Sequence, residues 1–261
     1  MTKPSILNGV RDVLGAPGDR KALPKNGLQI DTLIKCIEQD CSDSRGKSNW
    51  LLRHQPLKDP SKHKPDSEVR LERAIAAAFD GNNCPENCPK NCPKNCLWNQ
   101  MPTASGLLAV GEESRRAVDL VYKPAEPIGR YEFLELKVQR MNGAQDSLHH
   151  AIKELFEYGL LYLFSRIKRT ELGYSGEAYK VLDASHIGLR VIAPPSYYEK
   201  VDPEDESLCK EVNDALKAYL MCGVIPGLTM DIGLDEISCE ATDSPQAIRD
   251  AFVNKQRRKL A

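Results

Sequence analysis

Residues 116–140, RAVDLVYKPAEPIGRYEFLELKVQR, predict two short β-strands, over 117–122 and 131–138, joined by a loop. The first strand is apolar apart from Asp119. In the second, Glu135 and Lys137 stand two residues apart and therefore share one face, while apolar residues occupy the other. If the strands are neighbours, Asp119 lies beside Glu135. Two acids and a lysine then share one patch of an otherwise apolar sheet.

This patch indicates a site for phosphodiester cleavage assisted by a metal. Buried charges are costly unless they are paired or hold a cation. Two carboxylates and a main-chain carbonyl supply the oxygen ligands that Mg²⁺ prefers. A lysine on the same face could orient or help deprotonate the attacking water and offset developing negative charge. The alternative interpretation is a half-exposed hairpin whose charges face water.

The pattern D-(x)n-E-x-K on a strand pair resembles the PD-(D/E)xK phosphodiesterase superfamily, the restriction-endonuclease-like nucleases. Asp119, Glu135 and Lys137 match its three signature positions. The resemblance implies an α/β protein with a three-layer α/β/α fold and a central mixed sheet. It also implies a nuclease that uses Mg²⁺ or Mn²⁺ and acts on nucleic acid, DNA rather than RNA. Asp119, Glu135 and the main-chain carbonyl of Leu136 would hold the metal.

A helix pattern, SEVRLERAIAAAF, precedes these strands, with Ser67 as its N-cap. Members of the superfamily often carry a further glutamate on this helix, and Glu68 and Glu72 are the two candidates. Glu72 is favoured because it lies one turn deeper in the helix. The alternative is that both are surface glutamates.

The rest of the chain alternates between helical and strand patterns. A long helix is predicted over 147–166, in which Gly159 indicates close packing against the sheet. Within it, Glu154 and Tyr158 stand where many superfamily members carry a glutamine and a tyrosine, and His149 and His150 are predicted to face solvent. Strands are predicted over 186–193 and 228–234, and helices over 208–219 and 245–254. Their order predicts a mixed sheet with helices on both sides.

The N-terminal region differs in character from the rest. Residues 1–27 predict a loose arm, a helix is expected from Ile30 to Ile37, and residues 40–67 predict a polar linker. The predicted organisation is therefore an arm, helix and linker over 1–66, followed by a nuclease-like domain over 67–261. The basic tail at 255–259 is expected either to touch phosphates or to favour solubility.

A cysteine repeat, CPENCPKNCPKNC, forms a loop over 84–96 inside that domain. Its prolines disfavour a helix in spite of the four-residue spacing. Four thiolates, from Cys84, Cys88, Cys92 and Cys96, could hold Zn²⁺ or an iron–sulfur cluster. The alternative is a tetrapeptide expansion without a ligand.

Composition limits the possible partners. The net charge is −1, so nucleic acid would have to bind through local patches. Neither a signal peptide nor a membrane-spanning run is evident, and a cytoplasmic location is expected, where cysteines are reduced or metal-bound. Because the chain has no excess of basic residues, a rival function also stays open. It is a catalytically silent member of the fold that binds nucleic acid or protein.

Overall fold

The computed structural model describes residues 5–15, 24, 27–42, 48–52, 63–64, 67–79, 95–108, 116–138, 147–199 and 202–258. Their elements, in chain order, are α1 Asn8–Leu14, α2 Ile30–Asp40, α3 Glu68–Phe79, β1 Cys96–Pro102, β2 Ala117–Lys123, β3 Arg130–Leu136, α4 Leu148–Ile167, the 3₁₀ helix η2 Glu177–Asp183, β4 His186–Ala193, α5 Pro195–Tyr198, α6 Pro203–Met221, β5 Thr229–Glu236, α7 Pro245–Val253 and β6 Gln256–Arg257. None of these helices is long and apolar enough to cross a membrane.

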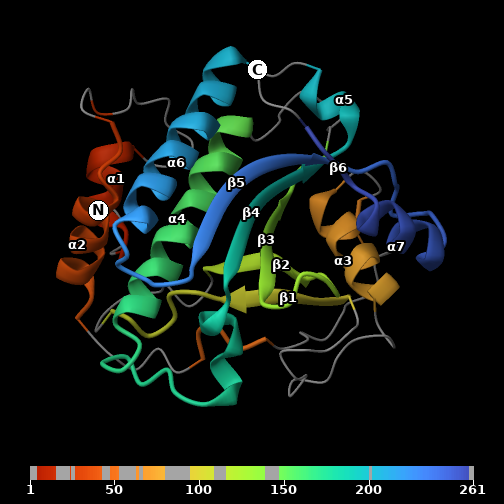
Figure 1. Cartoon of the computed structure of the whole chain (residues 1–261). Helices are drawn as coiled ribbons and strands as arrows, with labels where there is room; N and C mark the ends of the chain where they lie inside the picture. Colours follow the sequence, from red (N-terminus) through yellow and green to blue (C-terminus); the bar gives the residue numbers. More distant parts are fainter. Residues whose placement is uncertain are drawn as a thin grey trace.

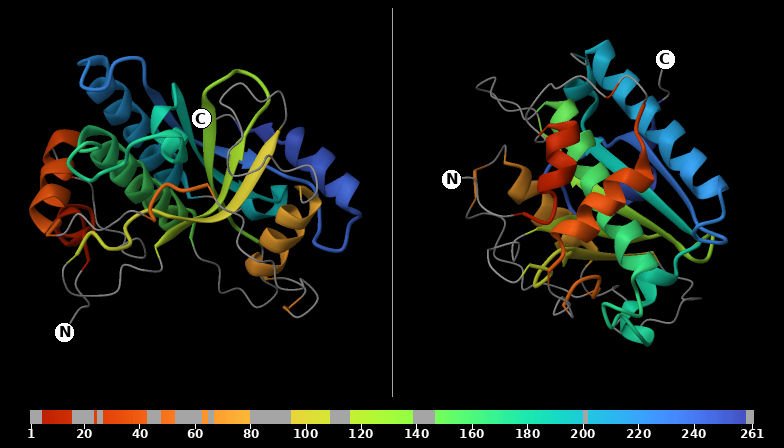
Figure 2. Two further views of the ribbon diagram at one scale, coloured as in Figure 1. Left: turned by 90° about the horizontal axis from the view of Figure 1, so that it is seen from below. Right: turned by 90° about the vertical axis from the view of Figure 1, so that its left-hand side faces the viewer.

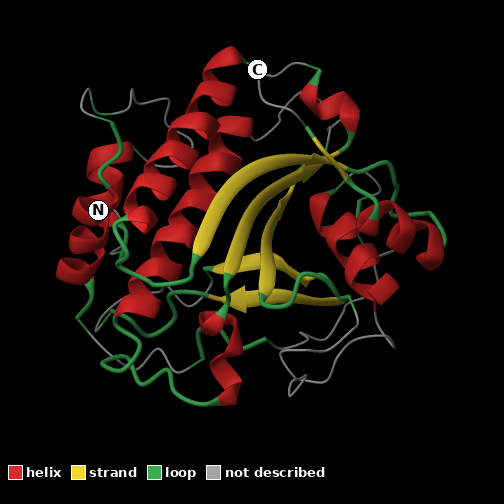
Figure 3. Cartoon of the chain, in the orientation of Figure 1, coloured by secondary structure: helices red, strands yellow, loops and turns green. Residues whose placement is uncertain are grey.

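The six strands form one open mixed sheet in the order β1 to β6 (Figure 3). Strands β3, β4 and β5 run parallel, while β1, β2 and β6 pair antiparallel with their neighbours. Helices α4, α6, α2 and α1 lie on one side of the sheet, and α3 and α7 on the other (Figure 1). The left view of Figure 2 separates the same two groups. The predicted α/β architecture with a mixed sheet is therefore confirmed.

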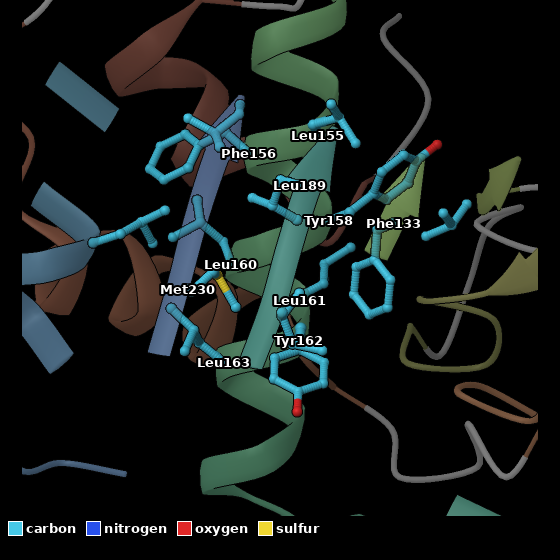
Figure 4. Close-up of a cluster of buried hydrophobic side chains, with 14 of the residues drawn as sticks. Phe133, Leu155, Phe156, Tyr158, Leu160, Leu161, Tyr162, Leu163, Leu189 and Met230 are labelled. Atoms are coloured by element: carbon cyan, nitrogen blue, oxygen red, sulfur yellow. The ribbon is translucent and has the colours of Figure 1, made fainter. Parts of the chain in front are cut away.

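Each face of the sheet has its own apolar core, because side chains alternate between the faces along every strand. On the α4 side, Phe133, Leu189 and Met230 pack against the apolar residues of α4 (Figure 4). On the α3 side, Phe79 and Phe252 pack edge to face with ring centroids 5.4 Å apart and join α3 to α7. The helix and strand patterns read over 147–254 are confirmed, with small shifts at their ends.

The predicted loose arm over 1–27 is wrong for its described part, which contains helix α1. Ile6, Leu7 and Val10 are fully buried in the core that also contains α4. Arg11 makes a two-pronged ion pair with Glu157 of α4, at 2.8 Å and 2.9 Å. The arm is therefore ordered by contacts with residues that lie far along the chain.

The described part of the basic tail also differs from expectation, because its charges pair with acids of the sheet. Lys255 lies 2.9 Å from Glu132, and Arg257 contacts Asp231 at 3.2 Å and Asp235 at 2.5 Å. These cations neutralise buried or half-buried carboxylates, so they are not a free basic surface for phosphate.

Gly159 is confirmed as the point of close approach between α4 and the sheet. A Cβ atom there would lie 2.9 Å from a methyl group of Leu189 and 3.4 Å from the sulfur of Met230. Both neighbours are buried, so they have little room to move.

Replacing Gly159 by valine is therefore expected to destabilise the protein. Overpacking of this kind costs about 1–3 kcal/mol of unfolding free energy. Urea denaturation measures the change. The control is Ala218→Val on the exposed face of α6, which is expected to cost about 0.5 kcal/mol from helix propensity alone. Equal costs at the two positions would contradict the close contact.

Candidate active site

The three signature residues come together because of the strand register. Pairing of Leu120 with Leu134 in the antiparallel ladder brings Asp119 opposite Glu135, one residue further along. Glu135 and Lys137 follow each other on the same face, and the Lys137 amide continues the β3–β4 ladder by bonding to the Ile192 carbonyl at 2.9 Å. Side chains that lie 16 and 18 residues apart in the chain thus share one end of the α4 face of the sheet.

A cavity of about 280 Å³ opens at this point. Its lining is formed by residues from α3, β1, β2, β3 and the first turns of α4, namely Glu68, Val69, Glu72, Gln100, Asp119, Glu135, Leu136, Lys137, His150 and Glu154. All three signature residues, both candidate glutamates of α3 and Leu136 belong to this set. The lining carries five carboxyl groups, one lysine and one histidine.

The strongest contact in the cavity joins Lys137 to Glu135. The ammonium donates to Oε1 of Glu135 at 2.8 Å and lies 3.9 Å from Oε2 of Glu68. Glu135 and Lys137 are nearly inaccessible to solvent, so the hairpin is not the solvated one of the alternative interpretation. Burial by itself would lower the pKa of Lys137, but the charges of Glu135 and Glu68 outweigh it and raise that pKa. Lys137 is therefore a cation at neutral pH in this structure.

The carboxyl groups repel one another. Burial raises the pKa of Asp119 to about 7, with further increases from the charges of Glu72 and Glu154. Burial also raises the pKa of Glu135 well above its usual value, and the charge of Asp119 adds to the shift. The cavity thus holds more negative charge than its own lysine offsets.

The two glutamates of α3 have different surroundings. Burial raises the pKa of Glu72, which accepts a hydrogen bond of 3.0 Å from Gln100 of β1. The strand register places Gln100 opposite Asp119 on β2. Glu68 is partly exposed and faces Lys137 instead. Glu72 therefore contacts Gln100, the cross-strand neighbour of Asp119, whereas Glu68 lies beside Lys137.

Sequence reasoning missed two contributors to the cavity. Gln100 lies on β1, for which no strand was predicted, and its φ of 53° is unusual for a residue other than glycine.

The prediction that His149 and His150 face solvent is wrong for His149 and only partly fulfilled by His150, whose side chain is 32% exposed. His149 is buried beside Asp205 of α6, at 3.3 Å, and His150 lines the cavity. Both histidines lie in the first turn of the helix capped by Ser147, and this position was the sequence feature that could have placed them near the cavity.

The donor set suits a hard divalent cation, because oxygen atoms of Asp119 and Glu135 face a polar cavity with excess negative charge. Among the described residues, no three His, Cys, Asp or Glu side chains are arranged to hold a metal ion as they stand. Binding would require the carboxylates to turn from their present positions.

The cysteine repeat lies mostly outside the described residues, which exclude Cys84, Cys88 and Cys92. Cys96 begins β1, is fully buried and is disulfide-bonded, so its sulfur is not a thiolate in this structure. Binding of Zn²⁺ or an iron–sulfur cluster to the repeat stays a prediction.

The raised pKa of Asp119 gives a stability prediction for the metal-free protein. The folded state holds a proton on Asp119 up to about pH 7, whereas an unperturbed aspartate loses it near 3.8. The folded state therefore binds more protons between these values, and the free energy of unfolding decreases as the pH rises through that window. Asp119→Asn is expected to flatten this decrease, measured by urea denaturation at pH 4.5, 6 and 7.5 in EDTA. The same pH dependence of the unfolding free energy in both proteins would contradict the raised pKa of Asp119.

Comparison of the chain with protein-family models, with curated proteins and with solved structures finds no match.

Proposed function

We propose that this protein is a metal-dependent nuclease of PD-(D/E)xK type, with a restriction-endonuclease-like fold, that hydrolyses phosphodiester bonds in nucleic acid. The observation that carries the proposal is the convergence of Asp119, Glu135 and Lys137 with the glutamates of α3 at one negatively charged cavity. Buried carboxylates that repel one another cost stability, and a bound cation would offset that cost. DNA is the favoured substrate over RNA.

Each residue of the cavity has its own role in the proposed reaction. Asp119, Glu135 and the Leu136 carbonyl would hold Mg²⁺ or Mn²⁺, and the bound ion would supply Lewis-acid polarisation and neutralise charge on the phosphate. Lys137, a cation here, orients the scissile phosphate and offsets its developing negative charge. Gln100 holds Glu72 in place, and Glu72 or Glu68 supports the metal ligands from α3.

A second candidate function is a catalytically silent module that binds nucleic acid or protein. One observation favours it: Lys137 already pairs with Glu135, and no described group of ligands is arranged for a metal. The cavity would then be a buried ion-pair cluster without a catalytic role.

Cleavage assays with purified protein separate the two functions. Duplex DNA, single-stranded DNA and RNA are each incubated with Mg²⁺, Mn²⁺ or EDTA, and calorimetry measures binding of Mn²⁺ to the protein. The nuclease proposal requires metal-dependent cleavage of at least one substrate and saturable metal binding. Absence of both supports the binding module.

A further inference from the structure

The cavity contains a pair of side chains that the signature residues do not account for, His150 and Glu154 of α4. Nε2 of His150 lies 3.4 Å from Oε2 of Glu154, one helical turn later. The two side chains are 32% and 26% exposed, so they reach both the cavity and solvent. The histidine occupies the third position of α4, where its backbone N–H bonds to Oγ of Ser147 at 3.2 Å. The helix cap therefore fixes the backbone from which this side chain reaches the cavity wall.

Glu154 is held from its other side by Tyr158. The tyrosine hydroxyl lies 3.3 Å from Oε1 of Glu154 and 2.8 Å from the carbonyl oxygen of Ala117 on β2. Burial alone would raise the pKa of Glu154, but the hydrogen bond from His150 and the charge of Lys137 outweigh it and lower that pKa. Glu154 is thus a fixed carboxylate, able to stabilise a protonated imidazole beside it.

The proposed hydrolysis needs a group that accepts a proton from water, and Lys137 does not suit that role in this structure. Its ammonium stays protonated beside two carboxylates. Histidine is the side chain whose ordinary pKa lies nearest neutrality, and a general base works best there. A carboxylate that orients an imidazole at a reaction cavity is a recurring arrangement for proton transfer.

We infer that the His150–Glu154 pair accepts the proton of the nucleophilic water, an inference that rests on the proposed function. The water oxygen forms the new bond to phosphorus while its proton passes to Nδ1 of His150. Nε2–H of the resulting imidazolium is stabilised by the carboxylate of Glu154. The bond from phosphorus to the leaving oxygen breaks, its electron pair stays on that oxygen, and the oxygen takes a proton from solvent. His150 then returns its proton to solvent.

Charged groups from each neighbouring element line the cavity around the imidazole or act on its partner Glu154. They are Glu154 on α4, Asp119 and Arg116 at the start of β2, Glu135 and Lys137 at the end of β3, and Glu68 and Glu72 on α3. Carboxylates outnumber cations in this set, and a cation bound at the cavity would offset part of their negative charge.

The test compares His150→Gln with His149→Gln, the same change one residue away on a side chain that contacts α6. His150→Gln is expected to lower kcat by about 10²-fold and to remove the dependence of kcat/KM on one protonation near neutral pH. His149→Gln is expected to keep the wild-type rate once its folded fraction is matched by circular dichroism. Imidazole in the buffer should restore part of the activity of His150→Ala, and none to Asp119→Asn.

A second measurement is independent of activity. In the ¹⁵N NMR spectrum of metal-free protein, the pKa of His150 is expected to fall in Glu154→Gln, and its neutral form should carry the proton on Nε2. An unchanged pKa, or wild-type kinetics in His150→Gln while the wild type cleaves nucleic acid, overturns the inference and leaves the proposed function standing. If the wild type cleaves no substrate with either metal, the proposed function fails and the inference fails with it.

Discussion

Asp119→Asn is expected to lower metal-dependent cleavage by about 10³-fold or more while the protein stays folded. Asparagine keeps the shape of aspartate but lacks the negative charge that a divalent cation requires. Metal ions supply several kcal/mol of charge stabilisation in the transition state, and each 1.4 kcal/mol corresponds to a factor of ten in rate. Loss of one of two carboxylate ligands removes much of that stabilisation. Single-turnover cleavage and Mn²⁺ calorimetry measure the two effects separately.

The matched control is Asp214→Asn, on the exposed face of α6. The chemical change is identical, but this side chain is distant from the cavity lining, so rate and metal affinity are expected to equal those of the wild type. Cleavage that survives Asp119→Asn at the wild-type rate would belong to a contaminating nuclease. It would contradict both the assignment of Asp119 and the proposed function.

Asp231→Asn is expected to destabilise the protein strongly. Arg190 of β4 is fully buried, and its guanidinium donates to both carboxylate oxygens of Asp231, at 2.8 Å and 2.9 Å. Gly188 makes room for this arrangement, because a Cβ atom there would lie 2.6 Å from Nη2 of Arg190. Removing one partner leaves a buried cation without its counter-charge, which costs about 3–5 kcal/mol. Since Asp231 is itself 36% exposed, a value near the lower end, about 3 kcal/mol, is expected.

Two comparisons show whether burial is the cause. Asp31→Asn removes a carboxylate from the exposed pair with Lys35, 2.5 Å apart on α2, and is expected to cost less than about 0.5 kcal/mol. The double variant Arg190→Met/Asp231→Asn removes both charges, and is expected to recover much of the loss, since an apolar residue replaces the stranded cation. Urea denaturation measures the change in unfolding free energy for all three variants. Equal costs for Asp231→Asn and Asp31→Asn would show that the arginine reaches water.

The strand pair around the cavity was accessible to sequence reasoning because its information is local. Alternation over 131–138 predicted that Glu135 and Lys137 share a face, and the pattern placed Asp119 beside Glu135 on condition that the two strands are neighbours. The helix over 147–166 was also predicted from its apolar stripe, and the Ser147 cap and the close contact at Gly159 seen in the structure agree with it. These features depend on residues within about twenty positions of each other.

Contacts between distant segments explain what sequence reasoning missed. Helix α1 has seven residues, too few for a helical period to be read, and it is stabilised by Arg11 bonding to Glu157, 146 positions away. Strand β1 is buried on both faces over most of its length, so its residues do not alternate between apolar and polar. Without β1, neither Gln100 nor its contact with Glu72 could be foreseen.

The sequence by itself determined the two strands, the face that their acidic and basic residues share, and the helix that covers it. The reason is that strands and helices repeat every two and 3.6 residues, so their patterns can be recognised from residues close together in the chain. Tertiary structure alone decided that five carboxyl groups meet at one cavity and that His150 lines it. It also decided that Arg190 finds its partner on the next strand. The physical reason is that burial and charge depend on which distant surfaces come together, and the free energy of ionising a side chain is set by those surfaces.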